Sequence, residues 1–142
     1  MLKNLFAVVL AAVVAAGIGY ADQSASTVVV KSPKTEPTNG REMYMSYCSS
    51  CHGVAGKGNG PAAAALKTRP VDLTVLSKNN GGKFPSTHVV SVLQFGAASS
   101  SHGSAEMPVW GPLFGKMNAS NPQEETFRIG NLNRYLETIQ AK

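Results

Sequence analysis

The sequence predicts an all-α domain, and three observations lead to this fold class. Residues 124–140, "EETFRIGNLNRYLETIQ", repeat apolar side chains at the spacing of one helical face. Residues 84–96 show a second helical pattern, with Val89, Val92 and Leu93 on its inward side. The residues around the two cysteines show no pattern of parallel strands. The apolar face predicted within residues 124–140 consists of Phe127, Leu132, Tyr135, Leu136 and Ile139.

The N-terminal residues 1–21 carry the three parts of a secretory signal peptide. Lys3 supplies the positive charge, and residues 5–18 supply the apolar run. Gly19 and Ala21 then place small side chains before a cleavage point. An uncleaved membrane anchor is the alternative, because the apolar stretch reaches the short end of the ~17–25 residues that cross a bilayer. In both cases we expect a periplasmic or exported protein.

Residues 22–39 are rich in Ser, Thr and Pro, which predicts a flexible tether. Residues 40–142 then form one small domain that would benefit from a cofactor to pack against. Cleavage removes Lys3 and changes the net charge from +5 to about +4. The basic residues are scattered singly, so we expect no nucleic-acid partner. This charge supports only a weak preference for acidic protein surfaces.

Both cysteines of the chain lie in the motif "CSSCH" at residues 48–52. A thioredoxin-like redox pair would sit between a strand and a helix, and that pattern is missing from the sequence. A zinc site would need a second pair of ligands, whereas His88 and His102 stand alone. A disulfide between Cys48 and Cys51 would close a very small loop and stabilise the fold little.

Covalent haem attachment requires this cysteine spacing with a histidine directly after it. Two thiols three positions apart on one helical turn reach the two vinyl groups of a haem, and the next side chain faces the iron. Bacterial haem attachment takes place outside the cytoplasm, which agrees with the export signal. We therefore predict one haem c, covalently bound through Cys48 and Cys51, with His52 as an iron ligand.

Met107 is the candidate for the second axial ligand of the iron. It lies in "GSAEMPVWGPLF", which is predicted to be non-helical, and Pro108 fixes the backbone beside it. It follows His52 by 55 residues, enough chain to pass around the edge of a haem. A buried loop methionine is the competing interpretation, and His102 is the competing ligand. His/Met ligation raises the reduction potential above that of bis-His ligation and leaves no open position for a substrate.

The other candidate ligands are expected to serve the fold. Met43 is predicted to be a core residue, and Met45 a residue on the face of the same helix. Met117 is predicted to be exposed in a polar turn, and His88 to lie at the surface or boundary of its helix. Trp110 is expected to pack in the core rather than to form a docking surface.

From residue 40 to residue 141 the chain resembles the class I (monohaem) cytochromes c. The resemblance rests on "CSSCH" at 48–52, "MP" at 107–108 and helical patterns on both flanks. It implies a small cytochrome c fold of three to five helices wrapped around one covalently attached haem. The helix in "GREMYMSYC" would cross the C-terminal helix near its start, with Gly40 and Tyr44 at the contact.

The resemblance has two further implications for single residues. A close helix crossing would explain Gly130 inside the C-terminal helix, where glycine carries a local cost. A proline carbonyl would accept a hydrogen bond from the proximal histidine and fix its ring. Pro61 and Pro70 are both candidates for this acceptor.

The function implied by the resemblance is a single-electron carrier, not an enzyme, with redox proteins as donor and acceptor. The first alternative is a membrane-tethered haem subunit of a larger respiratory complex, which requires an uncleaved N-terminal segment. A haem peroxidase or ligand sensor with a labile sixth ligand is the second, suggested by the Gly- and Ser-rich residues 96–106. A thiol oxidoreductase without haem is the third.

Overall fold

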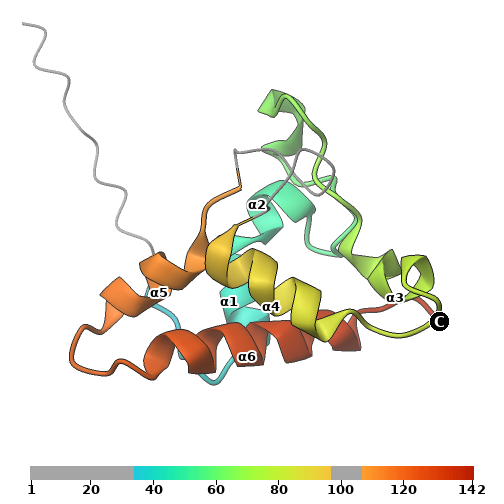
Figure 1. Ribbon diagram of the computed structural model, residues 1–142. Helices are drawn as coiled ribbons and strands as arrows, with labels where there is room; N and C mark the ends of the chain where they lie inside the picture. Colours follow the sequence, from blue (N-terminus) through green and yellow to red (C-terminus); the bar gives the residue numbers. More distant parts are fainter. Residues whose placement is uncertain (1–33, 97–106) are drawn as a thin grey trace, which may run out of the picture. The chain divides into compact units, whose positions relative to one another are not determined.

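The computed structural model describes residues 34–96 and 107–142, and within them every regular element is a helix (Figure 1). All of these residues belong to one unit of the chain, Lys31–Lys142. The all-α prediction is therefore confirmed. In the part of the chain that the structure describes, no helix is long and apolar enough to cross a membrane. The predicted signal peptide and the predicted tether up to residue 33 lie outside the described residues.

The helices follow one another along the chain with short connections. The four longer ones are α1 (Gly40–Tyr47), α4 (Ser86–Phe95), α5 (Trp110–Met117) and α6 (Glu124–Thr138). The single turns α2 (Ser49–His52) and α3 (Leu76–Asn79) and the 3₁₀ turns η1 (Ala63–Ala65) and η2 (Leu73–Val75) lie between them.

Helix α1 begins at Gly40 because the residue before it is a good N-cap. The side-chain oxygen of Asn39 accepts a hydrogen bond from the backbone N–H of Glu42 at 2.9 Å. Met43 is fully buried, which confirms it as a core residue. Met45 is half-buried and packs against the core from the face of the helix, as predicted.

Helix α1 crosses α6 at very close range (Figure 1). A Cβ atom at Gly40 would overlap the backbone carbonyl of Asn131. The rings of Tyr44 and Tyr135 pack beside this contact, with centroids 5.3 Å apart. The crossing predicted at Gly40 and Tyr44 is therefore confirmed. The role predicted for Gly130 is wrong, because a Cβ atom there would meet no atom within 4 Å.

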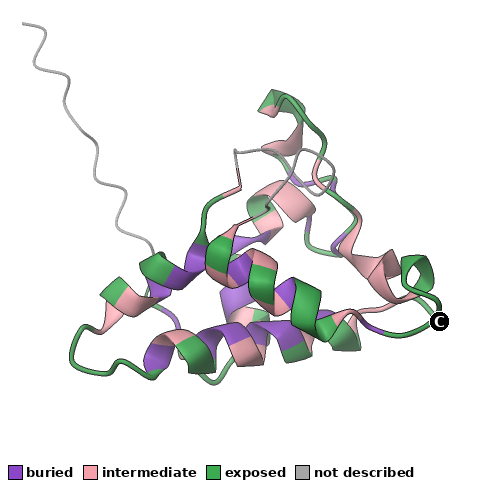
Figure 2. Cartoon of the chain, in the orientation of Figure 1, coloured by how far each residue is buried: buried purple, intermediate pink, exposed green. Residues whose placement is uncertain are grey.

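The buried face of α6 differs in one residue from the prediction (Figure 2). Phe127 is 55% exposed, so its predicted place on this face is wrong. Arg128 and Ile129 take the inward positions of that turn instead, because four and three residues before Leu132 they share its face of the helix. The remaining predicted residues are buried or pack against the core as expected: Leu132, Tyr135, Leu136 and Ile139.

Helix α4 packs against both α5 and α6. Val89 and Leu93 are buried, as predicted, and Val92 is half-buried. His88 is exposed on the same helix, which agrees with its predicted place at the surface or boundary. The sequence pattern therefore located this helix and its inward face.

Helix α5 forms where the sequence analysis predicts a non-helical segment. Pro112 falls in its first turn, where a missing N–H interrupts no helical hydrogen bond. Trp110 is buried and packs on Tyr47 and Phe114, with ring centroids 5.4 and 5.5 Å away, so its predicted packing role is confirmed. The prediction that Met117 is exposed is wrong. It is half-buried, and the Tyr47 hydroxyl donates to its sulfur at 3.8 Å.

The chain enters the domain earlier than predicted, at Thr35. This residue is 4% exposed, and Arg128 of α6 donates to its hydroxyl at 2.9 Å and to its carbonyl at 2.8 Å. The same guanidinium donates to the carboxylate of Glu124 at 2.6 and 2.9 Å. Residues 34–39 therefore belong to the domain, and the boundary predicted at residue 39 is too late.

We expect Gly40→Ala to lower the free energy of unfolding by about 1–3 kcal/mol, because the added Cβ must push α1 away from α6. Gly130→Ala is the matched control on the partner helix. Its Cβ has open space, so loss of a helical glycine raises the free energy of unfolding by about 0.5–1 kcal/mol. Chemical denaturation measures both, and effects of the same sign would contradict the crossing geometry.

The ion pair of Glu124 and Arg128 predicts a pH-dependent stability. Burial raises the pKa of Glu124, but hydrogen bonds from Arg128 and Asn118 and the charge of Arg128 outweigh it and hold the pKa below its usual value. This stabilisation is complete above the ordinary glutamate pKa of about 4.3 and is lost as the pH falls through the lowered value. At pH 7 we expect Glu124→Gln to cost about 3–5 kcal/mol, because Arg128 is left buried without its counter-charge.

Urea unfolding of Glu124→Gln and the wild type over a series of pH values measures this effect. The difference between them should shrink as the pH falls below the ordinary glutamate pKa, where the wild-type carboxyl becomes neutral too. Glu137→Gln, which removes an exposed carboxylate from the same helix, should change little at any pH. A Glu124→Gln effect that does not vary with pH would argue against the charged pair.

Candidate functional site

The motif residues lie on one helical turn directly after α1. The N–H of His52 donates to the carbonyl of Cys48 at 2.8 Å, and Gly53 ends the turn with a φ of 81°. Cys48 is buried and Cys51 half-buried, and both are free thiols. Burial and the neighbouring Cys51 raise the pKa of the Cys48 thiol to about 12. The structure thus brings Cys48, Cys51 and His52 together, as the motif predicts.

The glycine-rich loop after α2 folds back over the end of this turn. Gly58 donates its N–H to the carbonyl of His52 at 2.8 Å, and Gly60 donates to Cys51 at 3.0 Å. These bonds satisfy carbonyl groups that the short helix leaves unpaired. A Cβ at Gly60 would overlap the carbonyl of Ser50, so glycine is needed at this close approach.

The ring of His52 is held by a backbone carbonyl, as expected, but not by that of a proline. Its Nδ1 lies 3.1 Å from the carbonyl oxygen of Val71, the residue after Pro70. The predicted acceptors Pro61 and Pro70 are therefore both wrong. The predicted acceptor Pro70 is one residue away from the observed one. A backbone carbonyl has no residue-type pattern in the sequence, and the neighbouring proline is what marks this segment.

The surroundings of His52 favour the neutral form of its imidazole. Burial lowers the pKa of His52, and the hydrogen bond to Val71 opposes this only in part. With Nδ1 directed at the carbonyl, the Nε2 lone pair is the one left for a metal.

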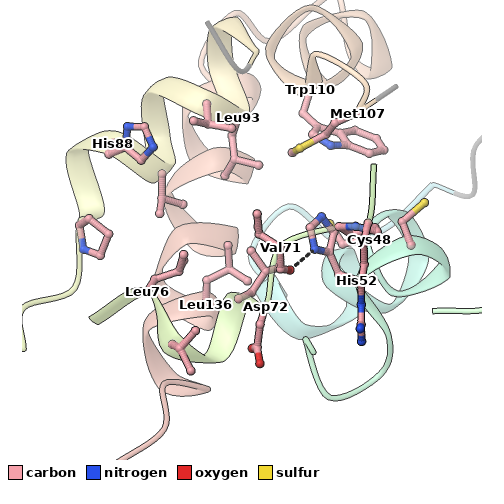
Figure 3. A pocket seen from close by; sticks show the side chains of 18 of the residues that line it. Cys48, His52, Val71, Asp72, Leu76, His88, Leu93, Met107, Trp110 and Leu136 are labelled. Atoms are coloured by element: carbon pink, nitrogen blue, oxygen red, sulfur yellow. Dashed lines mark hydrogen bonds between the residues drawn. The ribbon is translucent and has the colours of Figure 1, made fainter. Parts of the chain in front are cut away.

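His52, both cysteines and Met107 line one cavity of about 780 Å³ (Figure 3). Figure 3 shows Met107 and Trp110 across the cavity from His52. Within residues 34–96 and 107–142, no three His, Cys, Asp or Glu side chains are grouped as a metal site. The walls are mostly apolar and include Leu73, Leu76, Val89, Leu93, Trp110 and Leu136.

Met107 lies in the short non-helical stretch before α5. It is half-buried and packs against the core while it also faces the cavity. His88 lines the cavity as well, from α4. The competing ligand His102 and the rest of residues 97–106 lie outside the described residues. Among the described residues, Met107 is thus the methionine that lines the cavity together with the motif.

The sequence matches the protein family described as cytochrome c oxidase, cbb3-type, subunit III, over residues 35–121. The chain belongs to this family. It is a family of monohaem c-type cytochromes, which confirms the predicted resemblance. The matched stretch of the cbb3-type family begins at Thr35 and contains both the "CSSCH" motif and Met107. No match to the chain was found among curated proteins or among solved structures.

The haem c of the cbb3-type family fits this cavity. The volume lies within the roughly 300–1,000 Å³ of cofactor sites, and the apolar walls suit a porphyrin ring. Arg69 lines the cavity and would offer a positive charge to the haem carboxylates, with Asn79 and Asn80 as further polar groups of the lining. The lining also includes two thiols, an imidazole and a thioether, which are groups that can bind a haem.

Substitutions at two glycines with left-handed backbones test how tightly the loop packs on Pro70, the residue before Val71. Gly58 and Gly81 have φ values of 69° and 66°, but only a Cβ at Gly58 would overlap the carbonyl of Pro70. We expect Gly81→Ala to cost about 1–2 kcal/mol for the backbone alone. Gly58→Ala should cost about 1–3 kcal/mol more. Urea unfolding compares the two, and equal costs would contradict the packing of the loop on Pro70.

Proposed function

We propose that the protein is a single-electron carrier that holds one haem c through thioether bonds to Cys48 and Cys51. His52 and Met107 are the axial ligands of the iron in this proposal. The observation that carries it is the common cavity, in which both thiols, the imidazole and the thioether line one apolar space (Figure 3). Membership of a monohaem cytochrome family supports it independently.

The covalent step needs no additional oxidant or reductant. Each thiol would add across one vinyl group: a sulfur–carbon bond would replace the S–H bond, and the proton would move to the other vinyl carbon. Cys48 and Cys51, on one helical turn, would hold the haem beside His52. Bound haem then supplies the one-electron chemistry.

The remaining residues of the site define which chemistry is available. The Val71 carbonyl fixes the ring of His52, and the neutral imidazole donates through Nε2. The soft sulfur of Met107 would be the second ligand and would favour the reduced metal. With both His52 and Met107 bound, the iron would have no place for oxygen or a substrate, and it would supply electron exchange with docked redox proteins.

A second candidate is a membrane-tethered haem subunit of a larger respiratory complex. Two observations favour it: the apolar N-terminal residues 5–21 in the sequence and the oxidase subunit in the description of the family. In the first candidate the signal peptide is removed and the carrier is periplasmic. In the second the segment stays and keeps the haem domain near its partner.

The test is the visible and near-infrared spectrum of the purified protein in both oxidation states, together with its intact mass. We expect the mass of the polypeptide plus one haem, and a weak sulfur-to-iron charge-transfer band in the oxidised form. Met107→Ala should abolish this band. Met117→Ala is the matched control, because Met117 is also half-buried but does not line the cavity, and it should leave the band unchanged.

Each other outcome rejects a stated part of the proposal. A mass of polypeptide alone rejects haem attachment and returns the two cysteines to thiol chemistry. Haem without the charge-transfer band rejects Met107 and favours His102 or an open site, and with it ligand binding or peroxidase activity. The same mass separates the two candidates, since a retained N-terminal segment favours the membrane-tethered subunit.

A further inference from the structure

The residues that follow α6 turn back onto the segment that carries Val71. The side-chain amide of Gln140 donates to the carbonyl of Leu73 at 2.7 Å, and its oxygen accepts from the N–H of Ser77 at 2.9 Å. The next backbone N–H, that of Ala141, donates to the carbonyl of Thr74 at 2.7 Å. Three hydrogen bonds therefore tie the end of α6 to residues 73–77.

Gln140 supplies the N-terminal cap that helix α3 lacks. Helix α3 begins after Val75, whose side chain cannot cap the free N–H groups of the first turn. The oxygen of Gln140 takes this place for Ser77. The amide also donates to the carbonyl of Leu136, four residues earlier, at 2.7 Å, so the side chain is fixed on its own helix.

Gln140 and His52 each bond a carbonyl of the same short segment, residues 71–73, and hydrogen bonds fix this segment. Leu73 also donates its N–H to Gly56 at 2.7 Å, so both of its backbone groups are fixed. The carboxylate of Asp72 accepts from the N–H and the hydroxyl of Thr74 at 2.8 and 2.6 Å. Val71 precedes this rigid turn, and its carbonyl meets His52.

We propose that Gln140 is a positioning residue for His52: it holds the turn that keeps the Val71 carbonyl on the imidazole. This inference rests on the proposed role of His52 as an iron ligand. A hydrogen bond to the remote nitrogen of a ligating histidine fixes the ring plane and makes the other nitrogen a stronger donor. Loss of Gln140 then weakens this donor and favours the ferrous state.

A merely structural role is the competing explanation, and Asn131 provides the matched comparison. Its side-chain amide also donates to the carbonyl four residues earlier on α6, that of Phe127, at 2.9 Å. It also donates to a distant carbonyl, that of Pro37, at 3.0 Å. Both amides thus tie α6 to another segment, but that of Gln140 bonds the segment that follows Val71, whereas that of Asn131 bonds the segment before α1.

The experiment compares Gln140→Met with Asn131→Leu in the full-length, haem-loaded protein. Urea unfolding should show that both are less stable than the wild type. The ferric-to-ferrous ratio, measured at the wild-type midpoint potential, should fall about two- to three-fold in Gln140→Met and should stay at the wild-type value in Asn131→Leu. The haem methyl resonances of the ferric form, which report the orientation of the axial ring, should move in the same variant only.

Ala141→Pro is a second variant: it removes the N–H that donates to Thr74 and also restricts the backbone of Gln140 before it. Ala141→Pro should lower the ferric-to-ferrous ratio by a smaller factor than Gln140→Met does. Gln140→Met and Ala141→Pro with the wild-type ratio and wild-type methyl resonances would overturn the inference, whatever their stability. Absence of haem from the wild type would overturn the proposed function as well, so the two failures are distinguishable.

Discussion

The backbone contact between α1 and α6 at Gly40 is the constraint on which the rest of the site depends. Helix α1 leads almost directly into α2, so the direction of α1 decides where the two thiols and the imidazole of His52 lie. Tyr44 and Tyr135 hold the crossing in place, and Leu136, the next residue along α6, forms part of the cavity wall. A position without a side chain thus determines where the functional side chains are found.

A buried polar cluster lies about one turn before Asn131 on α6 and holds the segment that precedes α1. The guanidinium of Arg128 donates to Thr35 and Glu124, and it lies 5.9 Å from the ring centroid of Phe114. It therefore connects the segment before α1, helix α6 and the aromatic side chains of α5. Such a buried pair adds little net stability compared with apolar packing, because desolvation offsets the attraction. Its directional hydrogen bonds instead specify one position for the chain where it enters the domain.

The sequence allowed the fold class, the two crossing helices and the grouping of the motif residues to be predicted, because these depend on local periodicity and on a spacing with chemical meaning. The failures have physical causes. Phe127 is apolar, but at about 100° per residue it lies about 140° around the helix from Leu132, so Arg128 and Ile129 take the inward positions of that turn. A proline at the start of α5 looks like a helix breaker, although the first turn tolerates it. Val71 acts through its carbonyl, and no residue-type pattern marks a backbone atom.

The hydrogen bonds of Gln140 join residues that lie far apart along the chain. Gln140 lies 67 residues after Leu73, and α6 follows the other described helices along the chain. Contacts of this sequence separation form late, since the intervening chain must first lose its conformational freedom. Until the contact of Gln140 with Leu73 forms, Cys48 and Cys51 belong to a chain in which nothing from α6 holds the turn after Val71. Closure of the fold around them is completed from the C-terminal end.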